Sequence, residues 1–292
     1  MDITVALGGG GAKGNAHIGV LRRLEKEGYK IKSIAGTSFG GLVAVLYASG
    51  CSPDKIQELF ESVNYNELYG RRSDEGPALL GLGGVRELLD KALEERTFSE
   101  LQIPCAVTAV DIKSGNEIIL SEGSLKEAVL ATVALPGIFP TQHVNDWELV
   151  DGGVLNPVPV TVARMLSPDL PVVAVVLTDP PDMPVRGYSI PTPSILPRRV
   201  ADWLAKISIA QSFDTFLRSV DASSRAVAYL RLQIDKPDII ITPQVHHVDL
   251  LEKVVVADVA KLGEDAVEEV LPELKRAVSW TSRMKRKIFG SN

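Results

Sequence analysis

The sequence predicts an α/β fold with three α/β/α layers, in which helices cover both faces of a mostly parallel central sheet. Apolar runs of strand length alternate with segments of helical periodicity through the first half of the chain. Several of these runs are apolar throughout, which is typical of parallel strands buried on both faces. The chain has 292 residues, 45% of them hydrophobic, and shows no internal repeat or clean linker, so we expect one domain over residues 1–292.

The expected elements follow one another closely in the first half. Residues 3–7 form the first strand, and the helix over 14–28 carries Ile18, Leu21 and Leu24 on one face, with Gly28 as its stop signal. Further along we expect a strand over 31–35, an apolar helix over 41–49, a strand over 105–111, its partner over 117–120 across a turn, and a helix over 124–134 capped by Ser124.

The second half continues this pattern with longer interruptions. We expect a strand over 171–178, a long helix over 198–231, a strand over 238–243 and a final helix over 258–278. The domain then has a core over about 3–180, a helical extension with a late strand over 198–278, and a basic tail over 279–292. Residues 65–85 and 180–197 are predicted to be mobile surface loops, because they mix glycine, proline and charge.

Composition excludes several classes of function. The formal net charge of −6 argues against nucleic acid as the main partner. Four histidines and two distant cysteines give no metal-ligand spacing, so we expect no metal, and Cys51 and Cys105 are expected to be buried free thiols. No signal peptide and no membrane-spanning apolar run are visible, which predicts a cytoplasmic protein.

A run of four glycines, residues 8–11, lies between the first strand and the first helix and is followed by Lys13 and Gly14. A loop without side chains at a helix N-terminus exposes backbone N–H groups that suit a phosphate or an oxyanion. The dinucleotide pattern G-x-G-x-x-G also fits, but the second strand, 31–36, lacks the acid that would bind the ribose. The Walker pattern fails because Gly14 follows Lys13. An oxyanion site is the best interpretation, and a flexible turn is the simplest alternative.

A second glycine motif surrounds Ser38, with Gly36 and Gly40 on either side of it. Its position between a strand and a helix is typical of a nucleophile elbow, in which the helix N-terminus favours a developing alkoxide. A structural serine in a tight turn is the alternative. A nucleophilic serine needs a base. His17 is expected to be packed inside the first helix, while His143, His246 and His247 lie in loops without an obvious orienting acid.

A third motif offers a different base. Asp151 ends a short strand and is followed by Gly152 and Gly153. Alone, an Asp-Gly pair favours a tight turn. In combination with the two earlier motifs, it favours a functional carboxylate.

Together, the three blocks in this order resemble those of the patatin-like phospholipase family. Residues 16–21 and 135–140 are also similar to the family, and the resemblance covers about residues 3–180. It implies a Ser–Asp dyad in which Ser38 is the nucleophile and Asp151 the general base. The implied oxyanion hole consists of Gly9, Gly10, Gly11 and Lys13. The other implied motif glycines are Gly14, Gly36, Gly40, Gly152 and Gly153.

The resemblance also implies an activity, the cleavage of acyl esters of phospholipids or related lipids through an acyl-enzyme, with no cofactor or metal. The alternatives are a short-chain carboxylesterase or thioesterase, a nucleotide-binding protein, and a non-catalytic lipid-binding protein. Leu79, Leu80 and Leu82 form either the lip of an acyl channel or a small satellite cluster. The basic run over 275–289 is either a solvated tail or a peripheral contact with an anionic membrane surface.

Overall fold

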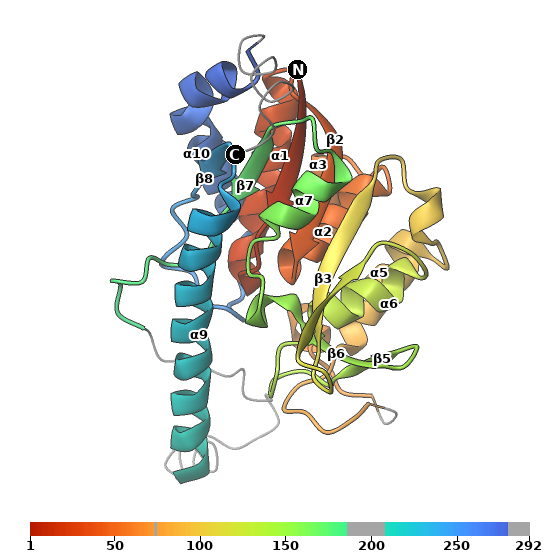
Figure 1. Cartoon of the computed structure of the whole chain (residues 1–292). Coiled ribbons are helices and arrows are strands. Elements are labelled where there is room, and N and C mark those ends of the chain that lie inside the picture. The colour runs from red at the N-terminus through yellow and green to blue at the C-terminus, as the bar shows by residue number, and fades with distance from the viewer. Residues whose placement is uncertain (73–74, 186–207, 280–292) are drawn as a thin grey trace.

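The computed structural model describes residues 1–72, 75–185 and 208–279. Its elements run along the chain as β1 (Asp2–Leu7), η1 (Gly11–Asn15), α1 (Ala16–Lys26), β2 (Lys30–Thr37), α2 (Phe39–Ala48), α3 (Pro53–Glu61), α4 (Tyr65–Leu68), α5 (Gly83–Leu93), η2 (Phe98–Glu100), β3 (Cys105–Asp111), β4 (Asn116–Leu120), α6 (Leu125–Thr132), β5 (Gln142–Val144), β6 (Trp147–Asp151), η3 (Gly152–Val154), α7 (Val160–Leu166), β7 (Val172–Val175), α9 (Ser208–Asp235), β8 (Ile239–Ile241) and α10 (Val256–Ala277). Figure 1 shows their arrangement.

Eight strands of the described chain form one mixed sheet in the order β5-β6-β3-β2-β1-β7-β8, with β4 paired to β3 off this path. Strands β3, β2, β1, β7 and β8 run parallel, while β4, β6 and β5 add antiparallel pairs at the β3 side. The predicted α/β fold with a mostly parallel sheet is therefore confirmed. Because β7 pairs directly with β1 and β8 follows it, the second half of the chain completes the β1 side of the sheet.

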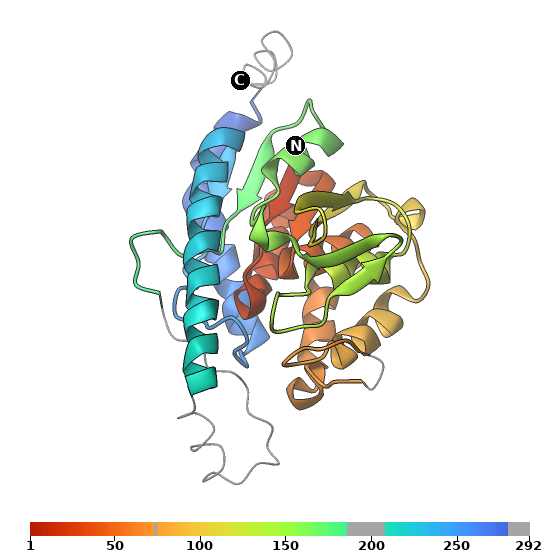
Figure 2. The ribbon, with the colours of Figure 1, turned by 60° about the horizontal axis from the view of Figure 1, so that its bottom comes forward.

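The two faces of the sheet differ in side-chain size. Ala6, Ala35, Ala106 and Ala174 lie in register on four neighbouring strands and pack against α7, with Leu232 of α9 beside them. The opposite face carries larger side chains, such as those of Val5 and Leu7, against α1, α2 and α10. The small face lets α7 approach closely, and α9 runs as a long helix along one side of the molecule (Figure 2).

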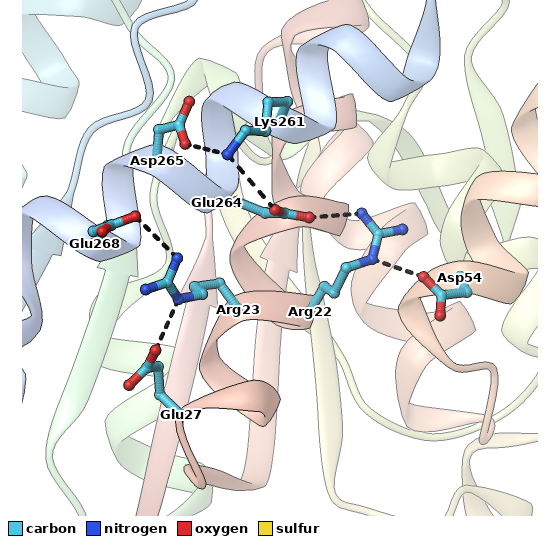
Figure 3. Close-up of polar contacts among 8 residues, drawn as sticks. All are labelled: Arg22, Arg23, Glu27, Asp54, Lys261, Glu264, Asp265 and Glu268. Atoms are coloured by element: carbon cyan, nitrogen blue, oxygen red, sulfur yellow. Dashed lines mark hydrogen bonds and ion pairs between the residues drawn. The ribbon is translucent and has the colours of Figure 1, made fainter.

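Helices α1 and α10 cross with their backbones almost touching. A Cβ added at Gly19 would collide with the Ala260 carbonyl, and one added at Gly263 would collide with the Ala16 carbonyl. Ion pairs flank the crossing: Arg22 contacts Glu264 of α10 at 3.0 Å and Asp54 of α3 at 2.7 Å, and Arg23 contacts Glu268 at 3.1 Å (Figure 3). Helix α10 therefore fixes α1, at whose start the glycine loop lies.

Local signals that the sequence offered are present in the structure. Gly28 has φ of +80° just after α1, and Ser124 caps α6 by accepting a hydrogen bond from the Glu127 N–H. No disulfide forms between Cys51 and Cys105, and Cys105 is buried as expected, whereas Cys51 is only partly buried. No helix in the described ranges combines the length and the apolar character needed to cross a membrane.

Other predictions differ from the structure or lie outside it. The segment over 65–85 is not one loop, because it contains α4 and the start of α5, and Leu82 within it is only 1% exposed. Helices α3, α5 and α7 and strand β5 were not predicted. The late part of the proline-rich loop, the start of the expected helix at 198 and the tail over 280–292 lie outside the described residues.

Candidate functional site

Ser38 lies in a sharp turn between β2 and α2. Its backbone has φ of 56° and ψ of −129°, a conformation that L-residues seldom adopt. The flanking glycines permit the turn: a Cβ at Gly36 would collide with the Gly40 backbone, and one at Gly40 would collide with the Leu7 and Gly8 carbonyls. The Ser38 N–H donates to Thr132 Oγ1 at 2.8 Å, which anchors the turn. The structure therefore has a sharp strand–turn–helix at Ser38, with the backbone geometry of an elbow.

Asp151 lies at the end of β6, and its side chain points at Ser38. The carboxylate accepts a hydrogen bond from the Gly153 N–H at 2.7 Å, and the Ser38 hydroxyl lies near enough to favour its charged form. Gly152 is needed because a Cβ there would collide with Thr108 of β3. Burial raises the pKa of Asp151 to about 6, although the Ser38 hydroxyl and the Gly153 N–H oppose this rise by favouring the charged form. The structure thus places a serine and a carboxylate that are far apart in the sequence beside each other.

No histidine contacts this pair in the described structure. His17 is fully buried, its Nε2 lies 2.7 Å from the Gly8 carbonyl, and burial lowers its pKa to about 4. It is a packed residue, as expected. His143 and His247 are exposed, and His246 contacts Asp179 with its Nδ1 at 3.0 Å. Among the described residues, the titratable neighbour of the Ser38 hydroxyl is therefore a carboxylate and not an imidazole.

The glycine loop lies directly against Ser38, since a Cβ at Gly9 would come within 3.1 Å of the Ser38 Cβ. The Gly9 N–H donates to the Pro157 carbonyl at 2.9 Å, and the Ala12 N–H donates to the Leu250 carbonyl at 2.8 Å. The N–H groups of Gly10 and Gly11 have no acceptor among the described residues. Gly9 is thus removed from the expected set of donors, because its N–H is already used.

Lys13 is also placed differently from its expected role. Its Nζ lies 2.9 Å from Asp179 Oδ1 in a nearly buried ion pair, and its backbone N–H donates to the Gly10 carbonyl at 3.2 Å. The ammonium group of Lys13 is therefore held at Asp179 and its backbone N–H is used by Gly10, so the expectation that Lys13 contributes directly to an oxyanion hole is corrected. Gly14, the last glycine of the motif, lies under the Phe39 ring, which leaves no room for a side chain.

A cavity of about 780 Å³ opens beside Ser38 and Asp151. Its walls are mostly apolar and include side chains from α2, α3, α5 and the segment after α6, among them Phe39, Leu42, Phe60, Leu82, Val85, Leu88, Leu135 and Phe139. The other side is formed by α9 and by residues 250–256. Of the three leucines expected at a lip, only Leu82 lines the cavity; Leu80 packs against the core and Leu79 is exposed.

Metal ligands are not grouped in the described part of the chain, where no three His, Cys, Asp or Glu side chains are arranged to hold an ion. Sequence reasoning missed the contributions of Asp179, of α9 and of residue 250 to the site. One signal was present for Asp179, which directly follows an expected parallel strand and so lies at the same sheet edge as the glycine loop.

Comparison with known proteins gives the family. A sequence model of patatin-like phospholipases matches residues 5–164, more than half of the chain. An uncharacterized NTE family protein of Mycobacterium tuberculosis is 30% identical over 208 residues, which cover 70% of this chain and 55% of that protein. The patatin-like phospholipase domain-containing protein 6 of Mus musculus is 25% identical over 251 residues, covering 80% of this chain and 18% of the mouse protein.

The chain thus spans about half the length of the mycobacterial relative it matches. Among solved structures, VipD from Legionella pneumophila superimposes with a TM-score of 0.54 at 15% identity and covers 92% of this chain and 66% of its own. At that identity the likeness concerns the fold. The matched region contains the Ser38 elbow and Asp151, and its extent shows that the chain belongs to the patatin-like phospholipase family.

Proposed function

We propose that this protein is a serine acyl hydrolase that cleaves carboxylic esters of phospholipids or related lipids. The observation that carries the proposal is that the Ser38 hydroxyl, on a strained elbow, lies beside the buried Asp151 carboxylate and that both line a large apolar cavity. A buried carboxylate with a pKa of about 6 is ionised at neutral pH and is a stronger base than a solvated one.

The proposed reaction proceeds in two steps. Asp151 takes the proton of Ser38 as Oγ attacks the ester carbonyl, and the N–H groups of Gly10 and Gly11 receive the negative charge that develops on the carbonyl oxygen. The tetrahedral intermediate then expels the alcohol, which takes the proton back from Asp151, and an acyl-Ser38 remains. Water then attacks the acyl carbonyl while Asp151 takes its proton, and the bond to Ser38 Oγ breaks. Ser38 Oγ takes the proton back from Asp151, and the fatty acid leaves. One oxyanion donor typically stabilises such a transition state by about 3 kcal/mol.

The cavity supports a lipid substrate, since its mostly apolar walls suit an acyl chain. We also propose a single domain, because β7 and β8 join the same sheet as β1, β2 and β3. A cytoplasmic location with peripheral membrane contact remains part of the proposal and rests on the composition of the sequence.

Two substitutions test the dyad. Ser38→Ala should abolish hydrolysis of a chromogenic ester and labelling by a fluorophosphonate, because the attacking oxygen is gone. Asp151→Asn keeps the acceptor for the Gly153 N–H but loses the base, and should lower kcat by roughly 10³- to 10⁴-fold. Steady-state kinetics and mass spectrometry of the labelled protein provide the readouts.

Matched controls are available in the turn before β6 and at the end of a nearby helix. Asp146→Asn, in the exposed turn before β6, and Ser62→Ala, at the exposed end of α3, should keep wild-type rates. Retained hydrolysis in folded Ser38→Ala or Asp151→Asn would contradict the proposed dyad.

A further inference from the structure

A buried ionic cluster lies next to the glycine loop and is not used by the proposed reaction. At its centre is Asp179, 8% exposed, shortly after β7. Asp179 Oδ1 lies 2.9 Å from Lys13 Nζ and 3.0 Å from His246 Nδ1, and Oδ2 lies 3.0 Å from the Arg225 guanidinium. Arg225 is 5% exposed and also contacts Asp221 of α9 at 2.6 Å. One carboxylate thus joins three segments far apart in the sequence.

The cluster is charged and balanced. Burial alone would raise the pKa of Asp179, but its contacts with His246, Lys13 and Arg225 outweigh burial and lower that pKa. Asp179 is therefore ionised, and two carboxylates face the two cations Lys13 and Arg225. A buried pair of this kind is costly to break from one side, because the remaining charge has lost its partner.

The cluster reaches the proposed oxyanion donors through a short stretch of backbone. Lys13 follows Gly11 by two residues, and its own N–H donates to the Gly10 carbonyl at 3.2 Å. Gly10 packs against Leu177, two residues before Asp179, at a spacing that would leave an added Cβ 3.0 Å from the Leu177 Cβ. The neighbouring Ala12 N–H is held by the carbonyl of Leu250, four residues after His246. The direction of the Gly10 and Gly11 N–H groups thus depends on how this cluster holds the loop.

We propose that Asp179 is a positioning residue, which holds Lys13 against α9 and the segment over 243–250 and so fixes the Gly10 and Gly11 N–H groups in the orientation that binds the oxyanion. The inference rests on the proposed function. It assigns Lys13 a role through the backbone of the loop and not through its ammonium group at the substrate. It also makes α9 and the 243–250 segment necessary for catalysis without direct contact with the reacting atoms.

The test compares kcat with KM for a chromogenic ester in Asp179→Asn, Lys13→Met and Lys13→Arg. Competent Ser38 is counted by complete titration of a separate aliquot of each protein with a fluorophosphonate, and kcat is expressed per competent site. Asp179→Asn and Lys13→Met should lower kcat by about 10- to 100-fold, because a small misplacement of the donors is costly, and leave KM within about twofold. Lys13→Arg keeps the charge and should recover kcat to within about threefold of the wild type.

A double variant and a distant control sharpen the comparison. Lys13→Met combined with Asp179→Asn should lose no more than the larger single loss, since both act through one contact. Asp238→Asn removes a carboxylate that lies 3.8 Å from Arg164 and holds the other end of β7 through the Val172 N–H, and should leave kcat unchanged. If Asp179→Asn does not fold, the kcat of Lys13→Met alone tests the inference. Asp179 keeps its contacts with Arg225 and His246 in that variant.

Two results would overturn the inference. One is a wild-type kcat per titrated site in folded Lys13→Met or Asp179→Asn, and the other is an equal loss in Asp238→Asn. A wild-type protein that neither hydrolyses esters nor reacts with the fluorophosphonate would overturn the proposed function and this inference with it. If the wild type is active and Lys13→Met and Asp179→Asn have the same kcat, the inference alone is overturned and the proposed function stands.

Discussion

Ser38 combines a strained backbone with a chain of hydrogen bonds that keeps it strained. A non-glycine residue at φ of 56° with extended ψ costs about 1–3 kcal/mol, which the surroundings must offset. The Ser38 N–H donates to Thr132 Oγ1, and that hydroxyl donates in turn to the Thr108 carbonyl of β3 at 2.7 Å. The same strand β3 pairs with β6 through Ala109 and Asp151. One strand therefore positions both members of the proposed dyad.

The pH dependence of catalysis should report the burial of Asp151. A base works only when ionised, so kcat/KM for a non-ionisable ester should rise tenfold per pH unit and level off above a pKa of about 6, the raised value that burial gives this carboxyl. A solvated aspartate would give a limb near pH 4. Stopped assays between pH 4 and pH 9 measure this pH profile of kcat/KM.

A limb near pH 4 would mean that Asp151 is hydrated in solution, and would contradict the structure. Asp146→Asn should not move the limb, because that carboxyl is exposed and lies in the turn before β6. Asp151→Asn should remove the limb together with most of the activity.

Among the elements, those with strong local signals were predictable and those defined by distant contacts were not. The apolar runs over β1, β2 and β3 predict these strands, and Gly28 predicts the end of α1. Helix α3 could also have been predicted, since Ser52 is its cap and Pro53 its first residue. Helix α5 begins at Gly83 and Gly84 without a side-chain cap, and Gly84 lies against the backbone of residues 67 and 68, a contact that only the folded chain defines.

The site divides in the same way. The glycine loop, the elbow and the Asp151 motif are each a short continuous stretch of sequence. Their presence and their order along the chain could therefore be read from the sequence. The contacts of Lys13 and Gly9 depend on Asp179 and Pro157, which the chain brings to the loop from more than 140 residues away. No local pattern contains that information, and both residues were therefore assigned a donor role that the structure does not support.

The crossing of α1 and α10 should be sensitive to a single methyl group. Gly263→Ala improves helix propensity by about 1 kcal/mol, yet the added Cβ would collide with the Ala16 carbonyl, and overpacking of this kind costs about 1–3 kcal/mol. Since that carbonyl is backbone and cannot rotate away, we expect a net loss of stability and a lower Tm, measured by calorimetry or urea unfolding.

Gly76→Ala is the matched control, because nothing lies within 4 Å of a Cβ at that position. It should leave the free energy of unfolding unchanged or slightly raised. A Gly263→Ala protein at least as stable as the wild type would show that the two helices do not cross this closely.

At the scale of the whole molecule, the cavity draws on nearly the full length of the described chain. The family match ends at residue 164, yet the walls include Leu217 and Val220 of α9 and residues 250–256. Strand β7 also inserts next to β1, so the later residues complete both the sheet and the cavity. The shape of the cavity is therefore a property of the assembled molecule and not of the motifs around Ser38 and Asp151 alone.

The size and apolar lining of this cavity lead to a prediction about chain length. Each buried methylene contributes about 0.8 kcal/mol, so kcat/KM for monomeric p-nitrophenyl esters should rise up to roughly fourfold per added methylene from acetyl to octanoyl. Val85→Phe places a larger side chain on the cavity wall and narrows the cavity, so it should reduce the rates on long esters while sparing the acetyl ester. Leu79→Phe, on an exposed leucine that does not line the cavity, should leave the series unchanged. Rates that are highest on acetyl and fall with length would instead favour a short-chain carboxylesterase or thioesterase, because a cavity that holds a fatty chain should reward each methylene it buries.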